Sequence, residues 1–525
     1  MSRLQISGLV ITALAAYSLL GQAPARPGVP APAIPPAVQR ALNSITAANL
    51  RGDLSFLASD ALEGRYTPSP GLDVAAEFIA SQFRAAGLEP GGDKDYFQTA
   101  EMIDRRMGQA QSDMTAQAGG RTFKIPAHAV VVVAGNQAAS ISNAPALVFG
   151  SPDPDLLKGA DLSGKAVVVP ALDRRKIPRE KLHDAYSKMR AFDAVVASST
   201  AAVEIVVASG PTPSPEPALI PADRASQARV PELVVSTDEL QKWIEKPVAD
   251  GEQRSVSVDL SAPEDRKVTV KNVVAILRGS DAALKTTCVM LTAHYDHIGT
   301  QATAGRMANP DAKQDSSDRI FNGANDDGSG TVSVIEIAKA LAKLNPHPKR
   351  SLVFVTFFGE ERGELGSSFY GSHPIFPVAK TVADVNLEQV GRTDSTVGQQ
   401  RNNASLTGYD YSDVTRFLEN AGRKTGIKLY MDKTASDAYF TRSDNASLAE
   451  QGVPAHTLTV AFDYPDYHGV GDEWQKVDYD NMARVDRMVA LGLVDIANSA
   501  RAPQWNAQNP KTAPFREAQR KLQGP

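Results

Sequence analysis

The sequence of 525 residues contains a single cysteine, Cys288. One thiol cannot close an intramolecular disulfide, so stability must come from core burial or from bound metal. The thiol lies in the strand-like stretch TTCVMLTAH. We therefore expect Cys288 to be a small buried residue of the core.

An excess of positive charge is also missing. The formal net charge is −5 at pH 7, and no cluster of lysine and arginine stands out. This argues against nucleic acid or an anionic membrane as a partner. The 42 % hydrophobic content is typical of a globular protein, and the length predicts two or more domains.

Long apolar runs are absent beyond the first residues, so the mature protein is expected to be soluble. The chain begins MSRLQISGLVITALAAYSLLGQAPARPGVPAPAIPP, with one arginine, an apolar run and then small residues and prolines. This pattern predicts a signal peptide over 1–25 and a proline-rich linker over 26–36, and hence an exported, periplasmic or extracellular protein. An uncleaved membrane anchor is the alternative.

The pattern of predicted secondary structure changes twice along the remaining chain. Helical patterns cover 36–60 and 71–87, and short β-rich runs such as HAVVVVAG and GKAVVVP follow. After about 265, strands alternate with helical patterns at 331–344, 412–424 and 479–498, which indicates an α/β sheet covered on both faces. We predict a first catalytic part at 37–115, an inserted β-rich domain at 116–265, a second catalytic part at 266–500 and a tail at 501–525.

Chemically active side chains follow the predicted strands of this α/β region. In open α/β sheets, functional groups collect beyond the carboxyl ends of strands. So much negative charge at one edge would be costly unless divalent metal, and more plausibly two ions, compensated it. The residues concerned are His294, Asp296 and His297, the loop residues Asp326 and Asp327, Glu360 and Glu361, Glu388, and His468.

Imidazole and carboxylate ligands without a thiolate suit zinc, with manganese or cobalt as substitutes. Two ions about 3.5 to 4 Å apart need a carboxylate that gives one oxygen to each. Asp326, in the glycine-rich stretch NGANDDGSG, is our candidate for this bridge. Asp327 is then expected to be a local structural partner.

The adjacent residues Glu360 and Glu361 need separate roles, because neighbouring side chains diverge as they leave a strand. We assign Glu361 as a ligand and Glu360 as the general base that takes a proton from water and passes it to the leaving amine. Asp296 is expected to hold the second nitrogen of His294, and His297 is expected to point elsewhere.

Each motif alone has a plainer explanation. HYDH could be a polar strand cap, and NGANDDGSG could be a turn whose aspartate caps the next helix. GEERGELGSS could be a solvated helix start. Their order and context along one predicted sheet edge favour the metal site.

With these residues in place, the chain resembles the co-catalytic dizinc aminopeptidase family. The stretches that carry the resemblance are TAHYDHIG, NGANDDGSG, FFGEERGELGSSFY, VNLEQVGR and DYHGVGDEWQKVD, in that order. The resemblance implies a zinc-exopeptidase-like three-layer sandwich with a mixed, mostly parallel sheet. The region 116–265, with ADLSGKAVVV and VPELVVSTDELQKWI, is similar to the protease-associated domain that many members carry as an insert.

Position by position, the resemblance implies a cis peptide between Asp326 and Asp327 and an oxyanion-assisting role for Tyr467. Two departures stand out: Glu388 occupies a position where aspartate is usual, and Asn445 follows Ser443 and Asp444 where histidine is common. The second departure concerns the substrate-binding wall. The implied zinc ligands are His294, Asp326, Glu361, Glu388 and His468, with Glu360 as the base.

These features predict a secreted or periplasmic zinc-dependent exopeptidase, with aminopeptidase action on peptides, through metal-bound hydroxide, as the preferred function. A carboxypeptidase or dipeptidase on the same two-zinc site is the alternative. A one-zinc glutaminyl cyclase is less compatible, because all five ligand positions are filled. A non-catalytic receptor-like protein is the alternative from another class.

Overall fold

The computed structural model describes residues 33–523, apart from 174–175, 179–180, 210–216, 246–252, 310–311, 313–316, 397 and 434. The predicted signal peptide and residues 26–32 of the predicted linker lie outside the described residues. Over the part of the chain that is described, no helix is both long enough and apolar enough to cross a membrane.

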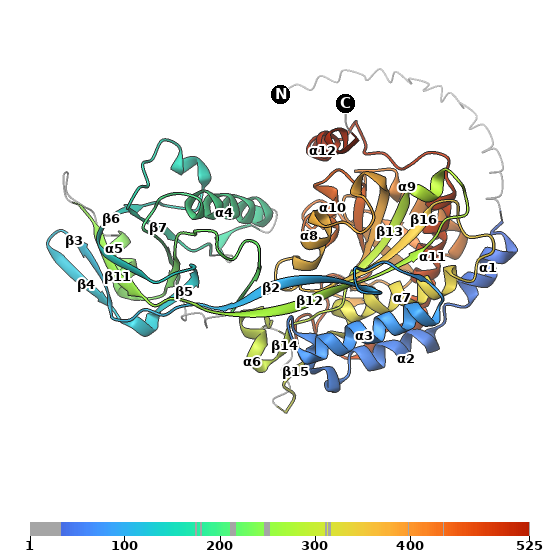
Figure 1. The fold of residues 1–525 in the computed structure, drawn as a ribbon, viewed down its shortest axis with the longest axis horizontal. Coiled ribbons are helices and arrows are strands. Elements are labelled where there is room, and N and C mark those ends of the chain that lie inside the picture. Colours follow the sequence, from blue (N-terminus) through green and yellow to red (C-terminus); the bar gives the residue numbers. More distant parts are fainter. Residues whose placement is uncertain are drawn as a thin grey trace, which may run out of the picture.

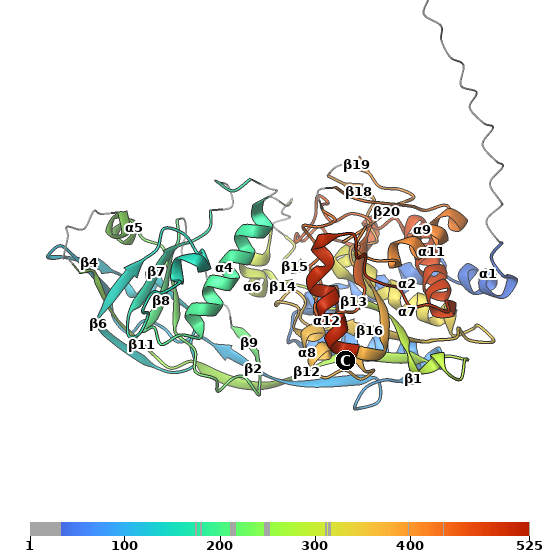
Figure 2. The ribbon, with the colours of Figure 1, turned by 90° about the horizontal axis from the view of Figure 1, so that it is seen from above.

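Two bodies lie side by side and are joined by a pair of long antiparallel strands, β2 (Phe97–Arg106) and β12 (Glu264–Leu277) (Figures 1 and 2). Both strands belong to a 10-stranded sheet in the larger body. Its strand order is β21-β20-β22-β17-β13-β16-β12-β2-β9, and β1 pairs with β12.

Four neighbouring strands at the centre of this sheet run parallel: β13 (Cys288–His294), β16 (Ser351–Phe357), β17 (Thr381–Leu387) and β22 (Ala455–Thr459). Toward the edges the pairing is largely antiparallel, as between β12 and β16 and between β20 and β22. The predicted mixed α/β sheet is confirmed, and its mostly parallel character holds for the centre. The remaining strands are β1 (Glu89–Pro90), β9 (Ala218–Pro221), β20 (Asn403–Leu406) and β21 (Lys428–Tyr430).

Helices cover both faces of the sheet, because alternate residues of the central strands are apolar on both sides. In β13, Val289 and Leu291 pack into the core beneath one helical layer, whereas Cys288 and Met290 pack into the core on the other face. Cys288 is fully buried, as predicted. The first layer contains α1 (Pro36–Asn43), α2 (Ala47–Leu57), α3 (Pro70–Ala85), α7 (Gly330–Leu341), α9 (Val414–Thr425) and α11 (Tyr479–Asn498); the second contains α8 (Leu365–Ser372), α10 (Asn445–Ala449) and α12 (Ala513–Gln523).

The smaller body is built on an 8-stranded sheet of order β4-β3-β11-β6-β7-β8-β10-β5. It has its own apolar core, which includes Trp243, and two helices, α4 (Leu182–Ala197) and α5 (Asp238–Glu245). The strand patterns of this region did not predict α4. Its assignment as a protease-associated domain over 116–265 stays a prediction. The strands are β3 (Met114–Ala118), β4 (Arg121–Ile125), β5 (Val130–Ala134), β6 (Ala139–Val148), β7 (Ala166–Pro170), β8 (Val203–Val207), β10 (Glu232–Val235) and β11 (Ser255–Leu260).

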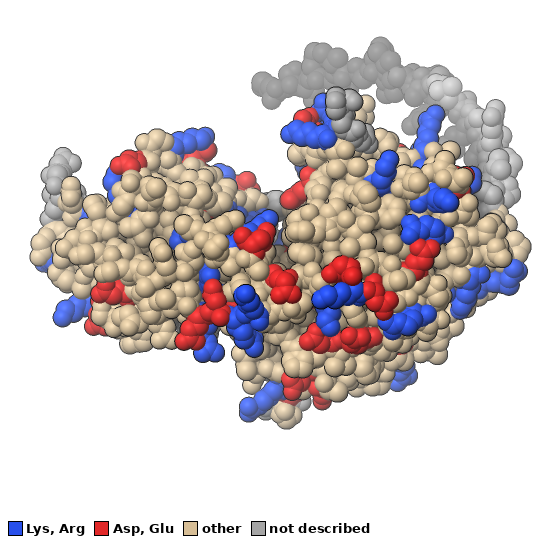
Figure 3. Space-filling model, viewed as in Figure 1, with Lys and Arg blue, Asp and Glu red and all other residues tan. Residues whose placement is uncertain are grey.

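Two-stranded ribbons lie outside these sheets: β14 (Gly299–Thr300) with β15 (Ile320–Phe321), and β18 (Asp394–Ser395) with β19 (Gly398–Gln399). The four-residue helix α6 (Gln301–Ala304) follows β14. On the face drawn in Figure 3, acidic and basic side chains are interspersed over both bodies.

Because the two bodies have separate apolar cores, we expect a core substitution in one body to leave the local stability of the other largely unchanged. The Trp243 side chain is fully buried, and its indole N–H donates to the Gln117 carbonyl at 2.9 Å. We expect Trp243→Ala to destabilise the smaller body by about 3 to 5 kcal/mol. Hydrogen exchange should show lost protection in β3, β8 and β11 and retained protection in β13 and β16.

The matched control is Phe354→Ala, which removes a fully buried ring from the main sheet. It should lower protection in the larger body first. Equal loss of protection in both bodies from either substitution would contradict the independence of the two cores.

Candidate metal centre

His294 ends β13, and Asp296 and His297 follow it in a turn where all three side chains are buried. The Asp296 Oδ1 atom lies 3.4 Å from His294 Nδ1 and accepts the backbone N–H of Glu360 at 3.1 Å. Its other oxygen accepts the hydroxyl of Thr67 at 3.1 Å. Asp296 therefore joins the end of β13 to the loop that follows β16.

The loop that carries Asp326 lies between β15 and α7, and the Asp326–Asp327 peptide is cis, as predicted. Asp327 Oδ1 accepts the backbone N–H groups of Gly330 at 3.0 Å and Gln389 at 3.1 Å. A Cβ on Gly330 would lie 2.3 Å from Asp327 Oδ2, so the close approach requires glycine. Asp327 thus connects this loop to the residue after Glu388.

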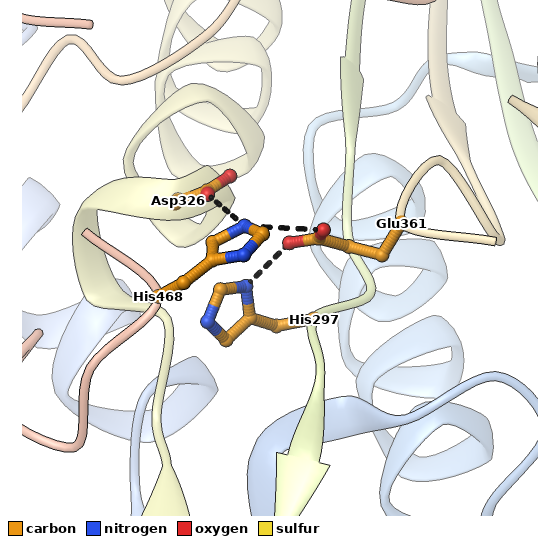
Figure 4. A group of neighbouring side chains, drawn as sticks. All are labelled: His297, Asp326, Glu361 and His468. Atoms are coloured by element: carbon orange, nitrogen blue, oxygen red, sulfur yellow. Dashed lines mark ion pairs between the residues drawn. The ribbon is translucent and has the colours of Figure 1, made fainter. Parts of the chain in front are cut away.

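Asp326 lies between two imidazoles that come from distant parts of the sequence. Its Oδ1 is 3.4 Å from His294 Nε2, and its Oδ2 is 3.2 Å from His468 Nε2 (Figure 4 shows the His468 side). Two atoms bound to one tetrahedral zinc lie about 3.4 Å apart, given bonds of about 2.1 Å. Each oxygen of Asp326 is therefore spaced to share a cation with a different histidine, which is the geometry of a bridging carboxylate.

Two groups of potential ligands meet at Asp326. His294, Asp326 and Glu388 form one, and the ligand atoms of each group lie within 4.8 Å of one another. In the other, Glu361 Oε2 is 3.2 Å from His468 Nε2, and the second nitrogen of His468 is 2.8 Å from the Met307 carbonyl. The structure thus brings together all five residues predicted as ligands.

His297 is where the sequence interpretation was wrong. It was expected to point away, but its Nδ1 lies 2.8 Å from Glu361 Oε1, and it belongs to the group with Asp326, Glu361 and His468 (Figure 4). The alternation of side chains along a strand does not extend beyond His294, where β13 ends. The segment that follows, in which His297 forms an isolated bridge with Tyr66, brings His297 back toward the site.

The pKa shifts show how crowded the carboxylates are. Burial raises the pKa of Glu388 to about 7, with Asp326 and Asp444 adding to the shift, and burial with nearby Glu388 and Glu361 raises that of Glu360 well above its usual range. Burial also acts on Glu361, but His468 holds its pKa at about 2. The imidazoles can stabilise only part of the negative charge, so the site suits added cations.

The predicted base and the predicted oxyanion-assisting residue both lie at this centre. Glu360 Oε2 is 3.9 Å from His294 Nε2. The Tyr467 ring stacks on His468 with ring centroids 4.1 Å apart. Burial and the nearby Asp326 and Glu361 raise the pKa of the Tyr467 phenol well above its usual value, so it stays a neutral donor.

Arg65, in the stretch LEGRYTPSP, supports the site and was not predicted from the sequence. Its side chain is 1 % exposed, and its guanidinium donates to the backbone carbonyls of Tyr295, Leu57, Asn322 and Gly323. Burial lowers its pKa to about 10, so it remains charged beside the acidic loop. It holds the ends of β13 and β15 together.

Asp472 was also missed, although it lies within the quoted motif DYHGVGDEWQKVD. It is fully buried, and its carboxylate accepts the backbone N–H of Asn325 at 3.0 Å and of Asp326 at 3.1 Å. The hydroxyl of Tyr464 donates to it at 2.9 Å. Asp472 therefore fixes the backbone that positions the Asp326 side chain.

Asn445, one of the two departures from the family pattern, belongs to the core. Its amide donates to the carbonyls of Phe440 and Ala455, and its oxygen accepts the hydroxyl of Thr457 at 2.8 Å. The side chain is fully buried and satisfied. Asn445 therefore has a structural role in the core, and its effect on the substrate-binding wall stays a prediction.

The loop that bears Glu360 and Glu361 contacts the segment before β9 and lies near α4 of the smaller body. In this loop, Arg362 donates to the carbonyls of Thr67 and Pro217, and Pro217 directly precedes β9. Burial and Asp444 raise the pKa of Glu364 to about 8, and Arg190 of α4 opposes that shift. One side of the metal centre therefore faces the smaller body.

Comparison with known proteins places this geometry in a family. Residues 272–492 match the profile described as Peptidase family M28. This segment belongs to peptidase family M28. It contains β13, β16, β17 and β22 and every ligand candidate named above.

Individual relatives of the M28 segment are distant. Leucine aminopeptidase 1 of Fusarium vanettenii is 29 % identical over 196 residues, 33 % of this chain and 45 % of that protein. A probable zinc metalloprotease of Pyrenophora tritici-repentis is 31 % identical over 133 residues, 25 % of this chain and 24 % of that protein. The chain spans 12 to 45 % of the length of the first curated relatives that it matches.

Among solved structures, an aminopeptidase from Aneurinibacillus sp. strain AM-1 matches with a TM-score of 0.55. The match covers 89 % of this chain and 97 % of that one, at 18 % identity. This likeness supports the fold of the M28 segment.

The role of Asp472 can be tested by zinc affinity. Asp472→Asn would place an amide group near the backbone N–H groups of Asn325 and Asp326, which need an acceptor. The Asp326 side chain would then no longer be held in its position between the two histidines. We expect zinc affinity, measured by chelator competition, to fall about 10- to 100-fold.

Tyr464→Phe is the matched control, since it removes one hydrogen bond to Asp472 and leaves the two backbone bonds. It should have the smaller effect. Unchanged affinity in Asp472→Asn would show that the loop does not depend on this carboxylate.

Proposed function

We propose that this protein is a zinc-dependent exopeptidase that removes residues from the amino end of peptides. The observation that carries the proposal is Asp326, whose two oxygens face two different imidazoles at 3.4 and 3.2 Å. Membership of the M28 segment in a peptidase family and the names of its relatives support the same chemistry.

Two zinc ions fit the available donors. We assign one to His294, Asp326 and Glu388 and the other to Asp326, Glu361 and His468. When bound, such ions supply Lewis acidity toward a carbonyl oxygen and an acidified water. Manganese and cobalt are possible substitutes.

The side chains of this protein would supply positioning and proton transfer. Glu360, beside His294, would accept a proton at its carboxylate from the attacking water and give it to the leaving nitrogen. The raised pKa of Glu360 suits both steps. Tyr467 would donate its O–H to the developing oxyanion.

Local charge favours the amino end of a substrate. Burial raises the pKa of Glu360 and Glu388 most, and nearby carboxylates, including Asp444, raise it further, whereas His294 opposes the shift. Such surroundings attract the ammonium group of a peptide and repel its carboxylate. We therefore prefer aminopeptidase over carboxypeptidase or dipeptidase action, with export and the protease-associated insert as accompanying predictions.

The function can be tested on purified protein with amino-acid anilides and dipeptides. Chelation should abolish amino-end release, and added zinc should restore it. Glu360→Gln should lower kcat by roughly 100- to 10,000-fold while zinc content stays unchanged, because it removes the base and no ligand.

Glu450→Gln serves as the control, since Glu450 is an exposed carboxylate near Glu364 with no assigned role. It should retain activity. Release that persists both after chelation and in Glu360→Gln would refute the mechanism, and cleavage only from the carboxyl end would favour the carboxypeptidase.

A further inference from the structure

His297 is a buried imidazole in the metal centre to which the proposed function gives no role. Its side chain is fully buried. It follows β13 and lies beside Glu361 and His468 (Figure 4). A histidine at this depth needs partners for its ring nitrogens, because unsatisfied polar groups are costly inside a protein.

His297 lies close to Glu361, but the two atoms in contact are not aligned for a hydrogen bond. His297 Nδ1 and Glu361 Oε1 are 2.8 Å apart. Within the described part of the chain, neither of these atoms has a hydrogen-bond partner, and neither does His297 Nε2. A short contact without alignment is expected where two atoms both turn toward a common third atom.

The two histidines already assigned as ligand candidates show the same combination of a close carboxylate and no hydrogen bond. His294 Nε2 and His468 Nε2 approach carboxylate oxygens at 3.2 to 3.4 Å, and neither has a hydrogen-bond partner among the described residues. The ligand atoms of His297, Asp326, Glu361 and His468 all lie within 4.8 Å of one another. His297 thus shares with these two histidines an unpaired nitrogen beside a carboxylate oxygen, although its 2.8 Å separation from Glu361 is shorter than theirs.

We propose that His297 is a fourth protein ligand of the metal held by Asp326, Glu361 and His468. This inference rests on the zinc assignment of the proposed function. It makes the two sites unequal: one has four protein ligands, whereas the other has three, namely His294, Asp326 and Glu388.

The different numbers of protein ligands imply different roles for the two metal sites. Zinc sites with four protein ligands are closed and structural, whereas sites with three leave a position for water or substrate. Glu360, at 3.9 Å from His294 Nε2, lies beside the three-ligand site. Water and substrate therefore belong there, and the four-ligand metal is the more tightly held.

Zinc X-ray absorption of the full-length protein tests the ligand count directly. Metal-free protein given one equivalent of zinc should fill the four-ligand site first. Its spectrum should then show two imidazoles bound to zinc, from His297 and His468. If His297 were not a ligand, the same metal would have only the imidazole of His468. A single imidazole in this sample would overturn the proposal.

The substitution His297→Asn separates a ligand from a hydrogen-bond donor, because the asparagine amide can still donate near the Nδ1 position but is a poor zinc ligand. We expect it to reduce the affinity of the tighter zinc by about 100-fold or more, beyond the 10- to 100-fold typical of an outer hydrogen-bond partner. Any smaller loss would make His297 a positioning residue for Glu361 and overturn the proposal.

His456→Asn is the matched control for loss of a buried imidazole. His456 is fully buried, with its nitrogens at 2.9 Å from the Thr407 carbonyl and 2.6 Å from the Ser412 hydroxyl. It should bind zinc as the unaltered protein does, and its melting temperature gives the cost of the replacement itself. A protein that binds no zinc at all would refute the proposed function, whereas two bound zinc ions with one imidazole on the first would refute only the role of His297.

Discussion

Buried negative charge is the constraint on which the rest of the structure depends. Asp326, Asp327, Glu360, Glu361 and Glu388 converge at one sheet edge, and burial raises the pKa of most of them. Asp326 and Glu361 are the exceptions, because neighbouring histidines hold the pKa of each below its usual range against the effect of burial. A fold that concentrates carboxylates in this way needs cations in the same place.

The fold meets this constraint through the parallel strands at its centre. Because β13, β16, β17 and β22 run in the same direction, the residues that follow them emerge at one edge. Side-chain bonds to the backbone then fix the loops: Arg65 binds four carbonyls, and Asp472 and Asp327 bind backbone N–H groups. The positions of the ligands depend on these supports as much as on the strands.

The sequence was informative where chemistry and periodicity coincide. The buried strands and α11 (Tyr479–Asn498) follow from apolar patterns, and the ligands follow from imidazoles and carboxylates at strand ends. Periodicity could not predict His297, which lies beyond the end of β13, or α4, whose apolar residues Phe192 and Val196 pack on one face of the second sheet. Arg65 and Asp472 act through backbone atoms of distant loops, and such long-range contacts leave no local pattern in a single sequence.

Charge balance also connects the metal centre to its substrate. Asp444, Glu364 and Asp472 add further carboxyl groups to those of the ligand candidates and Glu360, and burial raises the pKa of all three. Glu364 lies at the rim, where Arg190 of the smaller body opposes its raised pKa. In the proposed function, the same excess of carboxylates that calls for metal would also favour the ammonium end of a peptide substrate.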